Sequence, residues 1–293
     1  MLLQRLKSAS LIHPPEWLIS TTHYLTIMGS QAYGVSNDTS DCDIYGFAIP
    51  PKEDIFPHLR GEIMGFGRQN HRFDQWQEQH IEDKEARKEY DFSVYSIVKY
   101  FQLCMENNPN MIDSLFTPER CVLHSTQIAQ LVRESRRSFL HRGCWHKFKG
   151  YAYSQMHKMN SKDPEGKRRE TIEKFGFDVK FAYHVVRLLN EVEQILVEGD
   201  LDLQRNREQL KSIRRGDWTQ EQIVQYFADK EKMLEEAYSK SELPWGPDEE
   251  KIKSLLVRCL EMHYGNLDKA IVIPDRFENA LRQISEICRG LSL

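Results

Sequence analysis

Two aspartates one residue apart, Asp41 and Asp43, have the spacing that most directly suggests chemistry in this chain. They flank Cys42 at the start of an apolar segment, 43–49, which we expect to form a strand. Side chains i and i+2 of a strand point to the same face, so the two carboxylates would project together. Like charges in this arrangement repel unless a cation lies between them, and Mg²⁺ is typically held by one or two carboxylates plus substrate phosphates. The pair therefore predicts a site for Mg²⁺ or Mn²⁺.

A third carboxylate is expected at Asp91, within the short strand-like segment EYDFS. Two-metal sites for phosphoryl transfer hold their ions about 3.5–4 Å apart and commonly use a further carboxylate. Asp74 and Glu78 are the competing candidates for this position. The prediction is that Asp41, Asp43 and Asp91 form the catalytic, metal-binding set.

A Gly-Ser turn precedes the aspartate pair. Residues 24–30, YLTIMGS, read as a buried strand that ends in a turn at Gly29 and Ser30. Such a turn offers backbone N–H groups and a hydroxyl to the phosphates of a nucleotide. Gly-Ser and Asp-x-Asp are each common in ordinary loops. Their combination with two apolar strands and a later strand bearing an aspartate is what indicates a nucleotide site.

The remaining elements divide the chain in two. Strand-like segments are also expected at 62–67 and 71–81, and a helix with Ser93 as its N-cap follows. From about residue 122 the apolar residues recur at the period of a helix, without the alternation of a strand. The pattern predicts an α/β region followed by a helical region.

Basic and aromatic side chains of the helical region form two stripes that could face the nucleotide. Lys180, His184 and Arg187 follow i, i+4, i+7 spacing, and Tyr151 and Ser154 belong to a similar stripe. These residues are predicted to bind nucleotide phosphates, a base or an RNA backbone. The competing interpretation is a solvated helix face with a hydrogen-bonded histidine.

Composition narrows the class of protein. With 293 residues, 40% of them hydrophobic, the chain can bury a substantial core. No apolar run approaches the roughly 20 residues that span a bilayer, and the start does not resemble a signal peptide. The six cysteines are scattered, as is typical of reduced thiols, so a cytoplasmic protein is expected. Residues 1–125 are acidic, with 11 Lys and Arg against 17 Asp and Glu, whereas 142–187 are basic, with 11 against 5. This asymmetry suits a metal site that faces a phosphate-rich ligand.

The segment GSQAYGVSNDTSDCDIYGFAIPP resembles the signature of the DNA polymerase β-like nucleotidyltransferase superfamily, in which a hydrophobic-Gly-[Gly/Ser] motif precedes Asp-x-[Asp/Glu]. More narrowly, it is similar to the predicted nucleotidyltransferases associated with RNA repair. The blocks NNPNMIDSLF, FKGYAYSQM and DVKFAYHVVRLLNEVEQILVEGDLDL extend the resemblance over about 25–220.

The resemblance implies an α+β fold. Residues 1–122 would form a polymerase-β-like catalytic domain, a mixed sheet with helices. Residues 123–293 would form an all-α domain that completes the cleft for nucleotide and acceptor. The resemblance also implies that Gly29 and Ser30 contact the nucleotide phosphates and that Asp41 and Asp43 bind metal. Asp91 would be the third carboxylate, acting as general base or metal ligand.

The implied activity is Mg²⁺-dependent transfer of an NMP from an NTP to an acceptor hydroxyl, with RNA, such as a tRNA or a broken RNA end, as the acceptor. Two alternatives stay open. One is NMP transfer to a protein side chain, as in toxin–antitoxin branches of the superfamily. The other is a binding module that holds nucleotide or RNA without turnover. The sequence does not indicate which NTP is used, what the oligomeric state is, or what residues 225–293 do.

Overall fold

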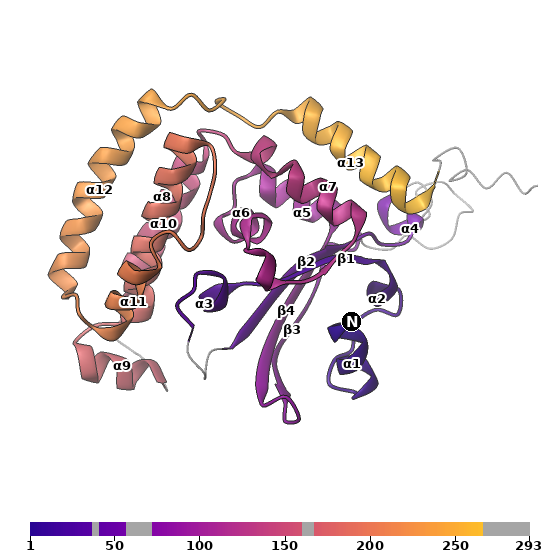
Figure 1. Ribbon diagram of the computed structural model, residues 1–293, viewed down its shortest axis with the longest axis horizontal. Coiled ribbons are helices and arrows are strands. Elements are labelled where there is room, and N and C mark those ends of the chain that lie inside the picture. Colours follow the sequence, from indigo (N-terminus) through magenta and orange to yellow (C-terminus); the bar gives the residue numbers. More distant parts are fainter. Residues whose placement is uncertain (37–40, 57–71, 160–166, 266–293) are drawn as a thin grey trace, which may run out of the picture.

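The computed structural model describes residues 1–36, 41–56, 72–159 and 167–265 of the chain. Its centre is a mixed sheet of five strands in the order β3-β4-β2-β1-β5 (Figure 1). The strands are β1 (Thr22–Ile27), β2 (Cys42–Ala48), β3 (Gln75–Asp83), β4 (Lys88–Ser96) and β5 (Val122–Ser125). β2 and β4 run parallel, and the other neighbouring strands are antiparallel. The predicted mixed sheet is confirmed.

One face of the sheet is covered by the two helices that begin the chain, α1 (Leu2–Ser8) and α2 (Leu18–Thr21). Ile44 of β2 and Phe92 of β4 are buried in the apolar cluster beneath these helices. Because strand side chains alternate, the neighbouring Asp43 and Asp91 lie on the opposite face. The hydrophobic alternation of two central strands thus decides which face carries the acidic residues.

The opposite face is partly covered by α5 (Ile97–Met105), α6 (Pro109–Phe116) and α7 (Gln127–Glu134). Its apolar core continues without interruption into the helical region. That region contains α8 (Cys144–Met159), α9 (Lys167–Phe175), α10 (Val179–Glu198), α11 (Arg207–Arg215) and α12 (Gln220–Lys240). α10 is the central helix and packs against α8, α11 and α12. The predicted helical region after the sheet is confirmed.

Local signals fix the ends of α10 and α11. Asp178 caps α10 by accepting a hydrogen bond from the backbone N–H of Lys180 at 2.9 Å. α10 ends at Gly199 and α11 at Gly216, both with positive φ, as expected for helix C-termini. The cap at Asp178 places Lys180 in the first turn of α10 and His184 in the second.

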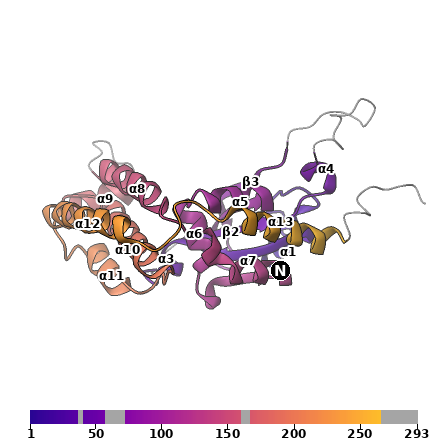
Figure 2. The ribbon, with the colours of Figure 1, turned by 90° about the horizontal axis from the view of Figure 1, so that it is seen from above.

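The last described helix, α13 (Glu249–Tyr264), crosses back over the first part of the chain. It packs against α5 and α7, away from the helical lobe (Figure 2). His263 near its end meets His23 of β1, with 2.9 Å between the two ring nitrogens. Residues far apart in the sequence thus close around one edge of the sheet.

Three details differ from the sequence-based expectations or fall outside them. Ser93 lies inside β4, and the N-cap of α5 is Ser96, whose Oγ accepts from the N–H of Lys99 at 3.1 Å. β5 was not expected, because four residues are too few to show alternation. The strand expected at 62–67 lies outside the described residues.

Shorter helical elements complete the described chain: α3 (Gly29–Ala32), α4 (Lys52–Ile55), η2 (Glu119–Cys121) and η3 (Arg136–Phe139). Five cysteines lie in the described part, and all five are buried free thiols. None of the described helices combines the length and the apolar character needed to cross a membrane.

Candidate active site

The parallel pair β2 and β4 brings two of the predicted carboxylates together. Asp43 is in register with Asp91, one residue on each strand. Both are partly buried and lie on the face away from α1 and α2. The long separation between them in sequence, 43 to 91, is therefore bridged by a single strand pairing.

The same strand arrangement delivers the Gly-Ser turn to Asp43. β1 is antiparallel to β2, so the end of β1 lies beside the start of β2, and the backbone N–H of Met28 donates to the carbonyl of Asp43 at 2.7 Å. Gly29 follows with φ +63°, and a Cβ at this position would lie 2.1 Å from Oδ2 of Asp43. Only glycine fits here without displacing the carboxylate. Gly29 and Ser30 open the short helix α3 and are partly buried.

The electrostatics of Asp43 reflect this crowding. Burial and the negative charge of Asp91 raise the pKa of Asp43 to about 6, and Asp41 acts in the same direction. The ammonium group of Lys180 opposes the shift. Among the described residues, no side-chain hydrogen bond satisfies the Asp43 carboxylate. A carboxylate that is desolvated, repelled and unbonded is suited to a divalent cation.

The other acidic candidates separate clearly. Asp41 is exposed and precedes the first residue of β2, close enough to influence Asp43 electrostatically. Glu78 accepts a hydrogen bond from the backbone N–H of His13 at 2.8 Å. It is in register with Phe92 of β4, so its side chain lies on the face covered by α1 and α2. Asp74 is exposed before β3 begins. Of the three candidates for the third carboxylate, Asp91 is the one beside Asp43.

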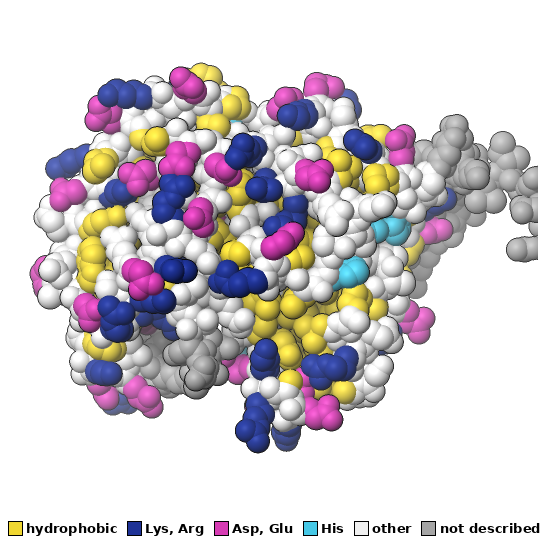
Figure 3. Space-filling model, in the orientation of Figure 1, with side chains coloured by type: hydrophobic (Ala, Val, Ile, Leu, Met, Phe, Trp, Pro, Cys, Tyr) yellow, Lys and Arg dark blue, Asp and Glu magenta, His cyan; other side chains and the backbone are white. Residues whose placement is uncertain are grey.

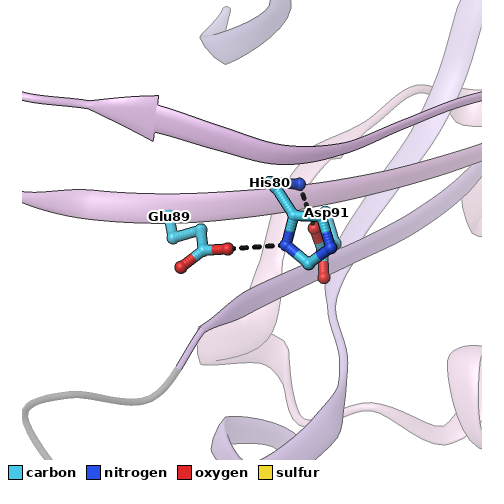
Figure 4. A group of neighbouring side chains, drawn as sticks. All are labelled: His80, Glu89 and Asp91. Atoms are coloured by element: carbon cyan, nitrogen blue, oxygen red, sulfur yellow. Dashed lines mark hydrogen bonds and ion pairs between the residues drawn. The ribbon is translucent and has the colours of Figure 1, made fainter. Parts of the chain in front are cut away.

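His80 is the nearest group to Asp91 on β3 (Figure 4). Its backbone N–H donates to Oδ1 of Asp91 at 2.7 Å, and its ring Nδ1 lies 2.8 Å from Oε1 of Glu89. The hydrogen bond that the ring donates to Glu89 and the charge of Asp91 raise the pKa of His80 above its usual value. One donor atom from each of His80, Glu89 and Asp91 lies within 4.8 Å of the others. Neither His80 nor Glu89 has a sequence spacing that assigns it to the site.

The start of α10 faces the carboxylates from the helical side. Lys180 is exposed, and both Lys180 and Tyr183 interact electrostatically with Asp43. His184 stacks on Tyr183 with 4.1 Å between ring centroids. Burial, reinforced by Arg187, Lys180 and Arg214, lowers the pKa of His184 well below its usual value. His184 is therefore neutral at physiological pH, and Lys180 carries the positive charge nearest Asp43 on this helix.

Arg187 lies deeper than the predicted stripe implied. Its guanidinium is buried, pairs with Asp113 of α6 and lies 3.0 Å from each carboxylate oxygen of Glu191. It also donates to the hydroxyl of Tyr33 at 2.8 Å and stacks over that ring, 4.4 Å from its centroid. Burial disfavours the charge on Arg187, but Glu191, Tyr33 and Asp113 more than offset it and raise its pKa. Arg187 thus connects α10 to the residue that follows α3.

Other helical-region side chains hold the same turn segment. Arg214 donates to the carbonyl of Val35 at 2.6 Å, and Gln204 donates to the carbonyl of Ala32 at 2.8 Å. Arg120, after α6, reaches the carbonyl of Gln31 at 3.4 Å. The segment from Gly29 to Val35 is therefore positioned by contacts from two parts of the chain, neither of which is adjacent in sequence.

Tyr151 and Ser154 lie on α8 with different surroundings. The hydroxyl of Tyr151 accepts from the side-chain amide of Asn108 at 2.9 Å, and it interacts electrostatically with Tyr45. Tyr45 is two residues after Asp43 and in register with Ser93, so Tyr151 borders the same face of the sheet. Ser154 is exposed one turn further along α8.

The surface around the site is mixed in charge. Over the helical lobe, Lys and Arg side chains alternate with Asp and Glu, and hydrophobic side chains gather near the centre of the face shown in Figure 3. Ion pairs that basic residues of 142–187 make with acidic residues elsewhere include Lys147 with Glu106 and Lys149 with Glu231. The basic excess seen in 142–187 is therefore partly neutralised in the fold.

Sequence reasoning missed the buried partners Tyr33, Asp113 and Glu191. Two signals were available: an aspartate within the apolar segment MIDSLF, and a glutamate four residues after Arg187 on a helix. The spacing indicates the pair of Arg187 with Glu191 within α10, but neither signal identifies Asp113 and Tyr33 as partners, because those contacts join α10 to α6 and to the residue after α3.

Comparison with known proteins gives three findings. The sequence model of RlaP, described as the RNA repair pathway DNA polymerase beta family, matches residues 5–258. An uncharacterized 38.9 kDa protein of Enterobacteria phage T4 is 26% identical over 113 residues, which is 38% of this chain and 31% of that protein. A nucleotidyltransferase-like protein from Exiguobacterium sibiricum covers 80% of this chain and 73% of its own, with 7% identity and a TM-score of 0.29. The last likeness is too distant to carry an argument about the site.

Proposed function

Because the chain belongs to the RNA repair pathway DNA polymerase beta family, we propose that it is a nucleotidyltransferase that moves an NMP from an NTP to a hydroxyl of RNA. The observation that carries this proposal is the pairing of Asp43 with Asp91 in register, with Gly29 against the Asp43 carboxylate. The cytoplasm is the expected location.

Asp43 and Asp91, with the exposed Asp41 beside them, would hold Mg²⁺ or Mn²⁺. The donor set fits a hard cation, since it consists of carboxylate oxygens, and no side chain in the described part of the chain donates a hydrogen bond to those of Asp43. When bound, such a cation neutralises phosphate charge and lowers the pKa of the acceptor hydroxyl.

The protein's own groups have separable roles in this proposal. Gly29 and Ser30 would receive the nucleotide phosphates, because the absence of a side chain at Gly29 leaves the approach to Asp43 open. Lys180 would neutralise phosphate charge from the side of α10. Asp91 would accept the proton of the acceptor hydroxyl or contribute to metal binding. Tyr151, Ser154 and His184 border the nucleotide, and Arg187 holds Tyr33 and so positions the turn.

The test is an incubation with each α-³²P-labelled NTP and Mg²⁺, with and without total RNA. Asp43→Asn removes the central carboxylate charge, and Asp74→Asn is the matched control, since Asp74 is exposed and outside the site. We expect one NTP to label RNA with the wild type and the control, and labelling to fall at least 100-fold with Asp43→Asn.

Other outcomes separate the alternatives. Label on protein alone would support transfer to a protein side chain. NTP binding measured by calorimetry, without labelling of RNA or protein, would favour a binding module. RNA labelled equally by Asp43→Asn would overturn the assignment of the site.

A further inference from the structure

The sheet contains a bulge directly opposite Asp91. Glu78 pairs with Phe92 and Ile81 pairs with Tyr90, so two residues of β3 face one residue of β4. The two are Gln79 and His80, and the one is Asp91. Bulges of this kind redirect a backbone group or side chain away from the regular ladder.

His80 has a backbone conformation that the bulge requires. Its φ is +57°, in the left-handed region that only a few per cent of non-glycine residues adopt, with asparagine, aspartate and histidine the most frequent among them. The side chain is 80% exposed, so packing does not hold it there. What the conformation achieves is a 2.7 Å hydrogen bond from the His80 N–H to Oδ1 of Asp91.

This hydrogen bond fixes one oxygen of Asp91. The carboxylate would otherwise be free to rotate away from Asp43, because the two like charges repel. A backbone N–H on a carboxylate is a charge-assisted bond, which is shorter and stronger than a neutral one. The imidazole also contacts Glu89 at 2.8 Å, but this pair is exposed to solvent and therefore adds little to holding the residue that supplies the N–H.

We infer that His80 is a positioning residue for Asp91 and acts through its backbone N–H, held by the left-handed bulge, and not through its imidazole. The inference rests on the proposed function for the role of Asp91 but concerns how that carboxylate is held beside Asp43. The competing role for the same geometry is the imidazole as a direct metal ligand, since His80, Glu89 and Asp91 are close enough to share an ion.

Substitutions at His80 distinguish the backbone from the side chain. His80→Asn removes the imidazole but tolerates positive φ, and His80→Gly removes the side chain entirely with no conformational penalty. His80→Val retains a side chain but disfavours positive φ strongly, because Val is β-branched. Arg87→Val is the matched control: Arg87 also has positive φ, +52°, but lies in the β3–β4 turn, directly before Lys88.

The first readout is the affinity for free Mn²⁺ without nucleotide, followed by electron paramagnetic resonance. We expect His80→Asn and His80→Gly to stay within about threefold of the wild type and His80→Val to bind about tenfold more weakly, as for other groups that orient a metal ligand. Arg87→Val should match the wild type in affinity even if its melting temperature falls.

The second readout is nucleotidyl transfer, where His80→Val should lower kcat and leave the KM for NTP near the wild-type value. If the wild type transfers no nucleotide but His80→Val still binds Mn²⁺ more weakly than the wild type, that result would support the positioning role and refute the proposed function. Equal losses in His80→Asn and His80→Val would assign the role to the imidazole and overturn the inference. Wild-type affinity in a folded His80→Val protein would overturn it as well.

Discussion

Asp43 is the residue on which the proposed chemistry of the site depends. It is partly buried, lies beside Asp91 and has a pKa raised to about 6 by burial and by that neighbouring charge. At neutral pH the metal-free protein therefore holds a carboxylate charge that its surroundings stabilise poorly. The unfolded chain carries no such penalty, so this residue is expected to lower the stability of the metal-free fold.

Asp43→Asn should raise the free energy of unfolding of the metal-free protein by about 1 to 3 kcal/mol at pH 7.5. The pKa of Asp43 is higher in the folded state, about 6, than its ordinary value of 3.8, so wild-type stability falls as pH rises through that range. The difference in free energy of unfolding between the wild type and the variant should then become smaller as pH is lowered from 7.5 toward 4. Urea unfolding at several pH values measures this difference, with Asp74→Asn as control. A variant less stable than the wild type at pH 7.5 would contradict the account.

Gly29→Ala tests the contact between the turn and the carboxylate. The new Cβ would lie 2.1 Å from Oδ2 of Asp43, so the carboxylate must move, and Mn²⁺ affinity should fall about tenfold. Gly176→Ala is the matched control, because Gly176 has φ +82° but no atom within 4 Å of the added Cβ. Both variants carry the strain of positive φ, and only Gly29→Ala should lose metal affinity. Calorimetric titration with Mn²⁺ checks this, and equal affinities for the two variants would refute the contact.

At the scale of elements, α10 links the helical region to the segment that begins at Gly29. Its first turn directs Lys180 toward Asp43, and two turns later Arg187 joins Tyr33, Asp113 and Glu191 in a buried network. Burial raises the pKa of Glu191 well above its usual value. The network therefore depends on the Arg187 charge to stabilise two carboxyl groups away from solvent.

Arg187→Met should destabilise the protein by about 3 to 5 kcal/mol, because it leaves Asp113 and Glu191 buried without their cationic partner. Arg205→Met removes an exposed arginine paired with Glu198 and should change stability little. Thermal and chemical unfolding of both variants measure the difference. A loss for Arg187→Met no greater than for Arg205→Met would show that the network contributes nothing net. The conservative Tyr33→Phe should lie between the two, since it keeps the ring under the guanidinium and loses one hydrogen bond.

At the scale of the molecule, a continuous apolar core joins the sheet to the helical region, and α13 closes over the first part of the chain. Part of that closure is the contact of His263 with His23, beside His124 and the hydroxyl of Thr126. Burial, together with the two neighbouring histidines, lowers the pKa of His23 to about 4, and burial lowers that of His263. Both rings are therefore neutral in the folded protein at neutral pH.

Acidification should weaken the docking of α13. The folded pKa of His23, about 4, lies below its ordinary value of 6.5, so stability is retained above pH 6.5 and lost as pH falls toward 4. We expect the protection factors of the α13 amides, which correct for the slower intrinsic exchange at lower pH, to fall between pH 7 and 5, and to fall less in His263→Gln. The comparison is made in an Asp43→Asn background, because Asp43 has the opposite pH dependence. An equal fall in protection in His263→Gln would remove the histidine pair as its cause.

Many residues of the candidate site could be predicted from the sequence alone. Turn residues and strand alternation are local signals, so Gly29, Ser30, Asp41 and Asp43 could be singled out and β1 and β2 located from sequence alone. Helical periodicity likewise predicted the region that holds α8, α10 and α12. Family resemblance added the expectation of a nucleotidyltransferase fold, which the match over residues 5–258 bears out.

Tertiary structure alone decided which of these residues meet. The register of β2 with β4 sets Asp91 and not Glu78 beside Asp43, and a one-residue bulge turns the N–H of His80 onto Asp91. Arg187 has the sequence signature of an exposed basic stripe, yet the packing of α10 on α6 and α3 buries it. Local patterns report a residue's own conformation and its face of an element. Pairings between distant segments depend on how those faces pack, which no single segment encodes.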